Sequence, residues 1–258
     1  MTQEVKIENN NIYLGDSYEL IKKIPDKSID LIYTDIPYLI EQGGCSDSAM
    51  SKRFKNMRDV QLKGITDGID YSIFGEFIRI TKYIYMYIWC SKEQILDIMN
   101  YFANIPNRKV RCNILVWCKT NPSPMTNGML LPDIEYCLLF KEEGSPRFND
   151  GYHLKSRWYI TPLNKNDKDE FGHPTIKPLE LVKRHIEHST QPNDIVFDPF
   201  LGSGTTAVAC KELGRQYIGF ELREDYFKIA VDRLNGINQK GQTDLFNTDF
   251  EQMSLFDK

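Results

Sequence analysis

The segment IVFDPFLGSGTTAVAC, residues 195–210, predicts a buried strand, a glycine turn and the start of a helix. The strand is the apolar run at 195–197, which ends at an Asp-Pro pair. Gly202 and Gly204 give the turn backbone freedom and let a ligand approach the main chain, so we expect a side chain at Gly204 to obstruct that approach. A helix that begins after such a turn directs unpaired N–H groups into the crevice beyond the strand ends, where open α/β sheets bind ligands.

The spacing of the glycines disfavours two common phosphate-binding motifs. The dinucleotide fingerprint G-x-G-x-x-G requires a third glycine after Gly204, and the segment has none. The phosphate loop requires Gly-Lys-Ser/Thr, and no lysine follows Gly204. What remains is D-P-F-x-G-S-G-T-T. An ordinary strand–turn–helix with packing glycines is the alternative.

A second acidic residue supports a ligand site at this turn. The segment QYIGFEL, residues 216–222, predicts the next strand, with Glu221 near its carboxyl end. A carboxylate about twenty residues past a glycine turn can accept hydrogen bonds from both hydroxyls of a ribose. A solvated glutamate at a strand end is the alternative.

The length and composition predict one folded domain. The chain has 258 residues, enough for a large α/β core, and is rich in aromatic residues. Its net charge of −4 means that any nucleic-acid surface must be local. The six cysteines show neither a C-x-x-C pair nor zinc-type spacing, so we expect reduced thiols and no metal. The polar N-terminus and short apolar runs favour a cytoplasmic protein without a signal peptide or membrane span.

A second candidate site lies in SIDLIYTDIPY, where a strand predicted at 29–33 runs into Asp35, Ile36, Pro37 and Tyr38. The carboxylate of Asp35 and the carbonyl of Ile36 can accept the two N–H bonds of an exocyclic amino group and make its nitrogen more nucleophilic. Pro37 fixes its own φ and biases Ile36 toward an extended conformation. Tyr38 can stack on an extruded base. A strand-to-turn junction without chemical function is the alternative.

Two segments are candidates for contact with a nucleic acid. Residues 39–68 follow the Asp-Ile-Pro-Tyr turn, and a mobile basic loop at this place suits a clamp over a phosphate backbone. Residues 144–172 look irregular and are long enough to suspect function. The candidate contacts are Lys52, Arg53, Lys55 and Arg58 in the first segment and Arg147, Lys155 and Arg157 in the second. A solvated helix face explains the first group equally well.

The rest of the chain predicts alternating helices and strands. Strands are expected at 11–15, at the end of 71–91, from 110 onward and within 129–143, the last as the antiparallel partner of the strand before it. Helices are expected at 18–24, in the first part of 71–91, and at 92–103, 179–189 and 224–234.

Together these motifs resemble those of the amino-DNA methyltransferases. D-P-F-L-G-S-G-T-T resembles their S-adenosylmethionine loop, and D-I-P-Y resembles their D-P-P-Y signature, with Ile36 replacing the first proline. The segments at 117–124 and 173–178 resemble the W-x-K-x-N-x-x-P and H-P-T-x-K-P motifs of the family. The resemblance covers residues 10–235.

The motif order resembles that of the β group of the family, a circular permutation in which the catalytic strand precedes the cofactor strand. The resemblance implies a Rossmann-like S-adenosylmethionine-dependent methyltransferase fold, an α/β fold with a mixed, mostly parallel sheet flanked by helices. It implies a catalytic domain at 1–235, with the basic loop at 39–68 and a small target-recognition insertion at 141–172. The remaining residues, 236–258, are expected to form a flexible tail.

The resemblance also implies a binding site for S-adenosyl-L-methionine, whose product is S-adenosyl-L-homocysteine, and no metal. The cofactor-binding residues would be Asp198, Pro199, Phe200, Gly202, Ser203, Gly204, Thr205, Thr206, Glu221 and Leu222. The H-P-T-x-K-P motif lines the methionine end in the family, so Thr175 and Lys177 are candidate partners of the cofactor carboxylate, beside His173. Asp16 ends a strand expected to neighbour that of Glu221, where it could accept from the adenine amino group of the cofactor.

The expected reaction is methylation of the N6 amino group of adenine in DNA, with the base flipped into a pocket at 35–38. Cytosine-C5 methylation requires a Pro-Cys nucleophile, which the sequence lacks. Cytosine-N4 methylation stays open, although its motif usually begins with Ser where this chain has Asp35. Single-stranded DNA or RNA stays open as substrate, because the recognition region is small. A dinucleotide-dependent oxidoreductase and a non-catalytic nucleic-acid binder are the alternatives from other classes.

The tail contains two similar pentapeptides, QTDLF at 242–246 and QMSLF at 252–256. Each resembles the peptide by which bacterial replication proteins dock on the sliding clamp. A flexible tail can present such anchors without a folded scaffold. The alternative is that the Leu-Phe pairs cover the enzyme's own core or the face of a homodimer.

Overall fold

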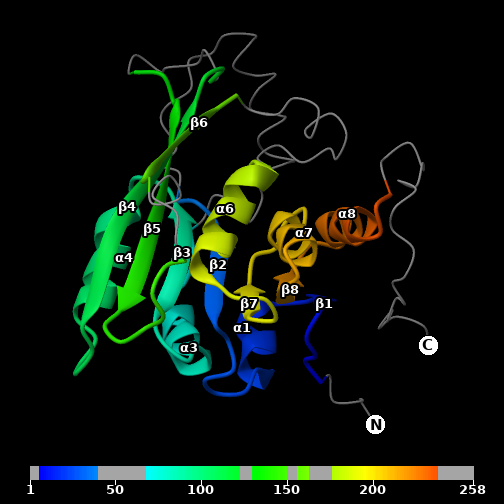
Figure 1. The fold of residues 1–258 in the computed structure, drawn as a ribbon, viewed down its shortest axis with the longest axis horizontal. Helices are drawn as coiled ribbons and strands as arrows, with labels where there is room; N and C mark the ends of the chain where they lie inside the picture. Colours follow the sequence, from blue (N-terminus) through cyan, green and yellow to red (C-terminus); the bar gives the residue numbers. More distant parts are fainter. Residues whose placement is uncertain (1–5, 40–67, 123–129, 150–155, 163–175, 238–258) are drawn as a thin grey trace.

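The centre of the molecule is one mixed β-sheet (Figure 1). The computed structural model describes residues 6–39, 68–122, 130–149, 156–162 and 176–237. The strands of this described part are β1 (Asn11–Leu14), β2 (Leu31–Asp35), β3 (Tyr85–Cys90), β4 (Val110–Lys119), β5 (Ile134–Glu142), β6 (Trp158–Thr161), β7 (Ile195–Asp198) and β8 (Gln216–Glu221). They form an eight-stranded sheet in the order β1-β8-β7-β2-β3-β5-β4-β6.

Helices flank this sheet on both sides. They are α1 (Ser17–Leu20), the short 3-10 helix η1 (Ile21–Lys23), α3 (Ile73–Ile80), α4 (Ile95–Ala103), α6 (Leu179–Ser189), α7 (Thr205–Glu212) and α8 (Glu224–Leu234). Neighbouring strands from β1 through β3 are parallel, β5 is antiparallel to β3 and β4, and β6 is parallel to β4. The expected mixed, mostly parallel sheet flanked by helices is confirmed.

The central strand β2 has apolar side chains on both of its faces. Leu31 and Tyr33 belong to the core under α6, α7 and α8, whereas Ile32 between them belongs to the core under α1, α3 and α4. Successive side chains of a strand point to opposite faces, and a strand covered on both faces therefore reads as a continuous apolar run. This is why LIYT carries no alternation of polar and apolar residues.

The topology brings the two sequence motifs to one edge of the sheet. Strands β2 and β7 are parallel neighbours, with Leu31 opposite Val196. Asp35 and Asp198 are the last residues of these strands, so both lie at the carboxyl edge. Because β2 precedes β7 in the chain, the permuted order of the motifs is a feature of the fold.

Strand β1 pairs with β8, as we expected for the strand that leads to Asp16. Leu14 lies opposite Glu221, and the backbone N–H of Gly15 donates to the carbonyl of Glu221 at 2.8 Å. Among the described strands, the first and the last in the sequence are therefore neighbours in the sheet, which places Asp16 in the neighbourhood of Glu221.

Several elements differ from the sequence expectation, among them α4, which begins at Ile95 and not at residue 92. Strand β2 begins and ends two residues later than predicted, so that Asp35 is itself a strand residue. The helix expected at 18–24 divides into α1 and η1. The stretch 144–172 was wrongly expected to lack regular structure, because it contains β6. Parallel pairing with β4 supports this short strand: Val116 donates its N–H to the carbonyl of Arg157 at 2.8 Å.

The described residues include cysteines, other possible metal ligands and apolar helices. The five cysteines among them, Cys90, Cys112, Cys118, Cys137 and Cys210, are all free thiols. Within the same residues, no group of three or more His, Cys, Asp and Glu side chains is arranged to hold a metal ion. In this part of the chain, every helix is too short or too polar to cross a membrane.

Candidate active site

Asp35 lies at the carboxyl end of β2 and forms an ion pair with Lys177. The distance from Lys177 Nζ to Asp35 Oδ2 is 2.5 Å. The same Nζ lies 2.9 Å from Oε2 of Glu135 on β5 and 3.2 Å from the hydroxyl of Tyr38. Lys177 therefore connects the Asp-Ile-Pro-Tyr turn to the antiparallel part of the sheet.

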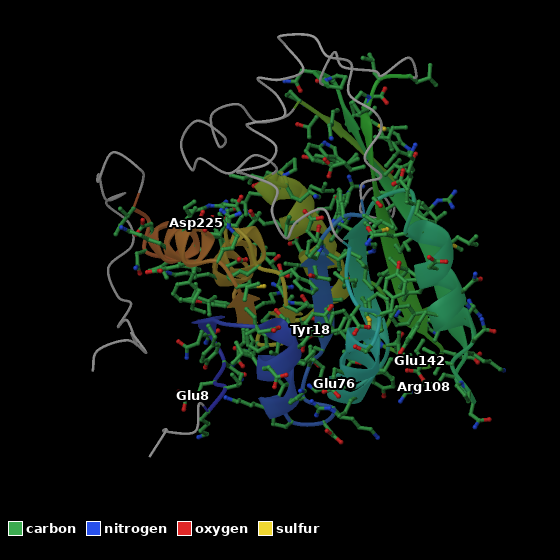
Figure 2. The ribbon with its side chains drawn as sticks, turned by 180° about the vertical axis from the view of Figure 1, so that it is seen from behind. Glu8, Tyr18, Glu76, Arg108, Glu142 and Asp225 are labelled. Atoms are coloured by element: carbon green, nitrogen blue, oxygen red, sulfur yellow. The ribbon has the colours of Figure 1, made fainter. Side chains whose placement is uncertain are left out.

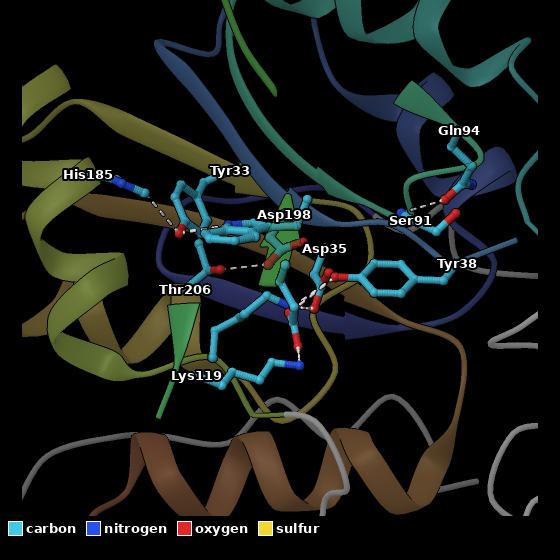
Figure 3. Close-up of polar contacts among 12 residues, drawn as sticks. Tyr33, Asp35, Tyr38, Ser91, Gln94, Lys119, His185, Asp198 and Thr206 are labelled. Carbon is cyan, nitrogen blue, oxygen red and sulfur yellow. Dashed lines mark hydrogen bonds and ion pairs between the residues drawn. The ribbon is translucent and has the colours of Figure 1, made fainter. Parts of the chain in front are cut away.

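Glu135 joins this ion pair to a second lysine. Its Oε1 lies 2.6 Å from Nζ of Lys119, which is labelled in Figure 3. Each oxygen of Glu135 therefore faces a different ammonium group. The side chains of Lys177, Glu135 and Lys119 are 7%, 12% and 14% exposed. Burial disfavours the charged form of Glu135, but the two ammonium groups outweigh it and lower its pKa to about 2. Burial also opposes the charge of Lys177, yet the carboxylates of Asp35 and Glu135 raise its pKa.

The two oxygens of Asp35 have different surroundings. Oδ2 is held by Lys177, whereas Oδ1 is buried and has no hydrogen-bond partner among the described residues. The side chain as a whole is 32% exposed. Burial raises the pKa of Asp35, Lys177 opposes this shift, and the charge of Glu135 adds to it. A buried acceptor without a donor is costly, so Oδ1 is a site where a donor from a ligand would be stabilised.

The Asp-Ile-Pro-Tyr turn is fixed by hydrogen bonds to β3 and to the residue before α4. Ile36 donates its N–H to the carbonyl of Trp89 at 3.2 Å. The buried amide of Gln94 donates to the carbonyl of Pro37 at 3.1 Å and accepts from the N–H of Ser91 at 3.0 Å (Figure 3). Gln94 therefore fixes the turn to the carboxyl end of β3.

Aromatic side chains support the site from the face of the sheet under α6. Trp89 Nε1 donates to the hydroxyl of Tyr33 at 2.9 Å, and this hydroxyl lies 3.3 Å from Nδ1 of His185. The His185 ring stacks on Tyr87, with ring centroids 4.7 Å apart. Burial lowers the pKa of His185 to about 3, so its imidazole is neutral near pH 7. This histidine supports the site as an uncharged ring.

The glycine loop is ordered around the buried carboxylate of Asp198. Its Oδ2 accepts from the hydroxyl of Thr206 at 2.7 Å, and its Oδ1 accepts from the N–H of Phe200 at 3.1 Å. Burial raises the pKa of Asp198 to about 7, against the effect of these hydrogen bonds. The hydroxyl of Ser17 donates to the carbonyl of Pro199 and ties the loop to the start of α1.

Helix α8 braces the far end of the loop. Arg233 Nη1 donates to the carbonyl of Ser203 at 2.7 Å and to the hydroxyl of Thr205 at 2.9 Å. Gly204 has a φ of 84°, and a Cβ built there would lie 2.8 Å from the Cβ of Ala230. The obstacles to a side chain at Gly204 are therefore helix α8 and the backbone conformation. A substitution there would disturb the packing of the loop against α8, whether or not it also blocks a ligand.

The carboxylate of Glu221 lies beside the loop and binds it through the backbone. Its two oxygens accept the N–H groups of Gly202 and Arg223, both at 2.8 Å. The neighbouring Leu222 is 68% exposed, although it is a large apolar residue. Asp16 is exposed at the end of β1 and caps α1 by accepting from the N–H of Tyr18 at 2.9 Å.

The predicted residues thus fall into two groups that share one edge of the sheet. The catalytic turn gathers around Asp35, and the loop residues gather around Asp198. Lys177, expected at the methionine end of the cofactor, contacts the catalytic turn. Arg147 and Arg157 are exposed. The remaining site candidates, Lys52, Arg53, Lys55, Arg58, Lys155, His173 and Thr175, lie outside the described residues.

Sequence reasoning did not find three residues that organise the site, namely Glu135, Gln94 and Arg233. For Glu135 the available signal was a carboxylate inside the run of apolar and aromatic residues at 134–140. Gln94 and Arg233 gave none, because both act on backbone carbonyls of segments far away in the sequence.

The glycine loop and its neighbours fit an adenosine group. Each oxygen of Glu221 keeps a lone pair beyond its backbone hydrogen bond, as acceptance from two ribose hydroxyls requires. The exposed Leu222 offers apolar surface for a purine. Residues that could hold a nucleoside therefore share the carboxyl edge of the sheet with the unpartnered oxygen of Asp35. This arrangement suits the class of enzymes that transfer a group from a nucleoside cofactor to an acceptor bound beside it.

Comparison with known proteins assigns the family. The model of the DNA methylase family, which covers N6 and N4 enzymes, matches residues 29–232, and the chain belongs to this family. It is 30% identical over 245 residues to the type II methyltransferase M2.LlaDCHI of Lactococcus lactis subsp. cremoris, with 88% of this chain and 90% of that protein covered. It is 32% identical over 250 residues to the type II methyltransferase M.HinfI of Haemophilus influenzae, with 88% and 69% covered.

A solved structure agrees with this assignment. The crystal structure of the M1.HpyAVI–SAM complex is 28% identical, with a TM-score of 0.63, and covers 86% of this chain and 98% of that one. The resemblance to the β group of amino-DNA methyltransferases and the Rossmann-like fold are confirmed. The chain is a site-specific DNA methyltransferase, and its cofactor is S-adenosyl-L-methionine.

Proposed function

We propose that this enzyme methylates the N6 amino group of adenine in DNA, with the base flipped into a pocket at residues 35–38. The observation that carries the proposal is that the two carboxylate oxygens of Asp35 differ in their hydrogen-bond partners. Oδ2 is anchored by Lys177, and Oδ1 is buried without a donor among the described residues. An exocyclic amino group supplies the N–H that Oδ1 lacks.

S-adenosyl-L-methionine, when bound, supplies a methyl group that its positive sulfur has already activated. The work of the protein is therefore to position and polarise the amino group. Asp35 Oδ1 and the carbonyl of Ile36 accept its two N–H bonds, which moves electron density onto the nitrogen. Tyr38 stacks on the base. In this proposal Asp35 Oδ1 also takes the proton that the amino nitrogen loses after it is methylated.

Cytosine-N4 methylation is the second candidate, because the family contains both kinds of enzyme. A cytosine amino group has the same two N–H bonds, so the acceptors alone do not separate the two bases. The residue type favours adenine, since the N4 motif usually begins with Ser at the position of Asp35. Single-stranded DNA and RNA are the alternative substrates.

One experiment separates these candidates. The purified protein is incubated with methyl-labelled cofactor and double-stranded DNA, single-stranded DNA or RNA, and the products are digested to nucleosides. We expect labelled N6-methyldeoxyadenosine, with the highest rate of methyl transfer on double-stranded DNA. Labelled N4-methyldeoxycytidine would replace the proposal by the cytosine-N4 alternative, and label on RNA alone would replace the substrate.

We also propose that the pentapeptides at 242–246 and 252–256, which lie outside the described residues, dock on a bacterial sliding clamp. Tethering would raise the concentration of the enzyme at newly made DNA. The test is a pull-down with purified clamp that compares the intact protein with one lacking residues 241–258. Equal binding by both proteins, or by neither, contradicts the idea. Loss of a homodimer on truncation supports packing of the tail instead.

A further inference from the structure

We propose that Glu135 is a positioning residue for methyl transfer: it holds the ammonium group of Lys177 on Oδ2 of Asp35 and so keeps Oδ1 free for the target amino group. The inference rests on the proposed role of Asp35 as the acceptor of that group. Lys177 Nζ lies between the two carboxylates, 2.5 Å from Asp35 Oδ2 and 2.9 Å from Glu135 Oε2.

The argument begins with the hydrogen-bond capacity of Lys177. An ammonium group has three N–H donors and no acceptor. Lys177 has three oxygen partners, namely Asp35 Oδ2 at 2.5 Å, Glu135 Oε2 at 2.9 Å and the Tyr38 hydroxyl at 3.2 Å. All three donors are therefore used, and none is left for Asp35 Oδ1. Removing one partner would release a donor within reach of the second oxygen of Asp35.

Glu135 is well suited to hold this arrangement, because its own position is fixed twice. Its strand β5 lies between β3 and β4 and is hydrogen-bonded to both. Its second oxygen is bound by Lys119 at 2.6 Å. The four charges alternate along a chain from Lys119 through Glu135 and Lys177 to Asp35, and together they are formally neutral.

The substitution Glu135→Gln keeps the shape of the side chain and removes its charge. The amide oxygen that stays at position 135 is a weaker acceptor than a carboxylate oxygen, so the donor of Lys177 that faced Glu135 can turn toward Asp35 Oδ1. We expect the rate of methyl transfer to fall by about a hundredfold, the size of effect that a small misplacement of a reacting group produces. The affinity for S-adenosyl-L-methionine should stay unchanged, since the described contacts of Glu135 are with Lys119, Lys177 and Tyr38.

A pH profile distinguishes positioning from a merely structural role. Asp35 must be ionised to accept the amino group, so activity is lost as the pH falls through its pKa. The negative charge of Glu135 raises that pKa. Glu135→Gln removes this contribution, and the acidic limb of the kcat profile should move to lower pH. A general loss of stability does not predict a shift in this direction.

Glu142→Gln is the matched control. Glu142 lies on the same strand, forms an ion pair with Arg108 at 3.1 Å and accepts from the N–H of Ile84 at 2.9 Å (Figure 2). The register of β5 against β3 places it at the opposite edge of the sheet from Asp35. Glu142→Gln therefore removes a partly buried ion pair of the same strand without reaching the site.

If Glu135→Gln alone is too unstable to measure, the double variant Glu135→Gln with Lys119→Met can be used in its place. It removes the ammonium group that would otherwise stay unpaired, so we expect it to regain thermal stability. The slow transfer and the shifted acidic limb should persist in it, because Lys177 still lacks its second carboxylate.

The experiment measures single-turnover transfer of labelled methyl groups to DNA across pH for the wild-type protein and the three variants. Slow transfer with an acid-shifted limb in Glu135→Gln and in the double variant, and wild-type behaviour in Glu142→Gln, is the expected result. Recovery of the wild-type rate in the double variant, or equal rates in the two single variants, overturns the inference. If the proposed function itself is wrong, the wild-type protein will label a nucleoside other than deoxyadenosine, which is a separate result from the rates of the variants.

Discussion

Lys177 Nζ lies 2.5 Å from Asp35 Oδ2, although the two residues are 142 positions apart in the chain. Lys177 comes from the H-P-T-I-K-P segment before α6, and Asp35 from the end of β2. The H-P-T-I-K-P motif was expected to line the cofactor, but its lysine contacts the Asp-Ile-Pro-Tyr turn. This turn is the expected binding site of the target base. A role of Lys177 toward the cofactor carboxylate stays a prediction.

We predict that Lys177→Met slows methyl transfer on the order of a hundredfold. The positive charge of Lys177 lowers the pKa of Asp35, so its removal raises that pKa further above the ordinary value. Asp35 is active when ionised, and the acidic limb of the kcat profile should therefore move to higher pH, opposite to the shift in Glu135→Gln. Lys183→Met, which breaks a surface ion pair with Glu212, serves as control. An unmoved acidic limb in Lys177→Met would contradict the coupling.

We predict that Gln94→Leu loosens the catalytic turn. The substitution removes the hydrogen bonds to the carbonyl of Pro37 and to the N–H of Ser91. Leaving these groups unsatisfied should lower the free energy of unfolding by about 1–3 kcal/mol. The kcat should fall while the affinity for the cofactor persists. Thermal denaturation and calorimetric titration with S-adenosyl-L-methionine check both parts, and a wild-type kcat would show that the turn does not depend on Gln94.

We predict that Glu221→Ala fails mainly in cofactor binding. The carboxylate holds the N–H groups of Gly202 and Arg223 and is the expected acceptor for the ribose hydroxyls. Calorimetry should show a weaker Kd for S-adenosyl-L-methionine, whereas the exposed Glu224→Ala on the first turn of α8 should bind like the wild-type protein. Equal affinities in the two variants would remove Glu221 from the cofactor site.

We predict that replacing Lys52, Arg53 and Lys55 together weakens binding to DNA. These residues lie outside the described part of the chain, and the prediction rests on their clustering after the catalytic turn in the sequence. Loss of three phosphate contacts should reduce the slope of log K against log salt concentration by about three. Titrations of DNA at several salt concentrations measure this slope, and an unchanged value would favour a solvated helix face.

Local patterns in the sequence were enough to predict much of the fold. The bounds of α6 and α8 agree with the expected helices, because the apolar periodicity of both helices and the proline before α6 are encoded in neighbouring residues. The motifs around Asp35 and Asp198 were likewise visible as strand–turn signals. The pairing of β1 with β8 followed from the order of the motifs.

Long-range contacts could not be predicted in this way. Glu135 reaches the site because β5 pairs with β3, a register that no local pattern contains. Strand β6 is supported by its pairing with β4. The reason for glycine at position 204 is the proximity of Ala230 on α8, which appears only when the helices are packed.

The central claim is that Asp35 accepts the amino group of a flipped adenine. Its most direct test is single-turnover transfer of labelled methyl groups to double-stranded DNA by the wild-type protein and by Asp35→Ala, with nucleoside identification and calorimetric titration of S-adenosyl-L-methionine. We predict N6-methyldeoxyadenosine from the wild-type protein, a loss of a hundredfold or more in the variant, and an unchanged Kd for the cofactor. Near-wild-type turnover by Asp35→Ala, or label on cytosine, would contradict the account.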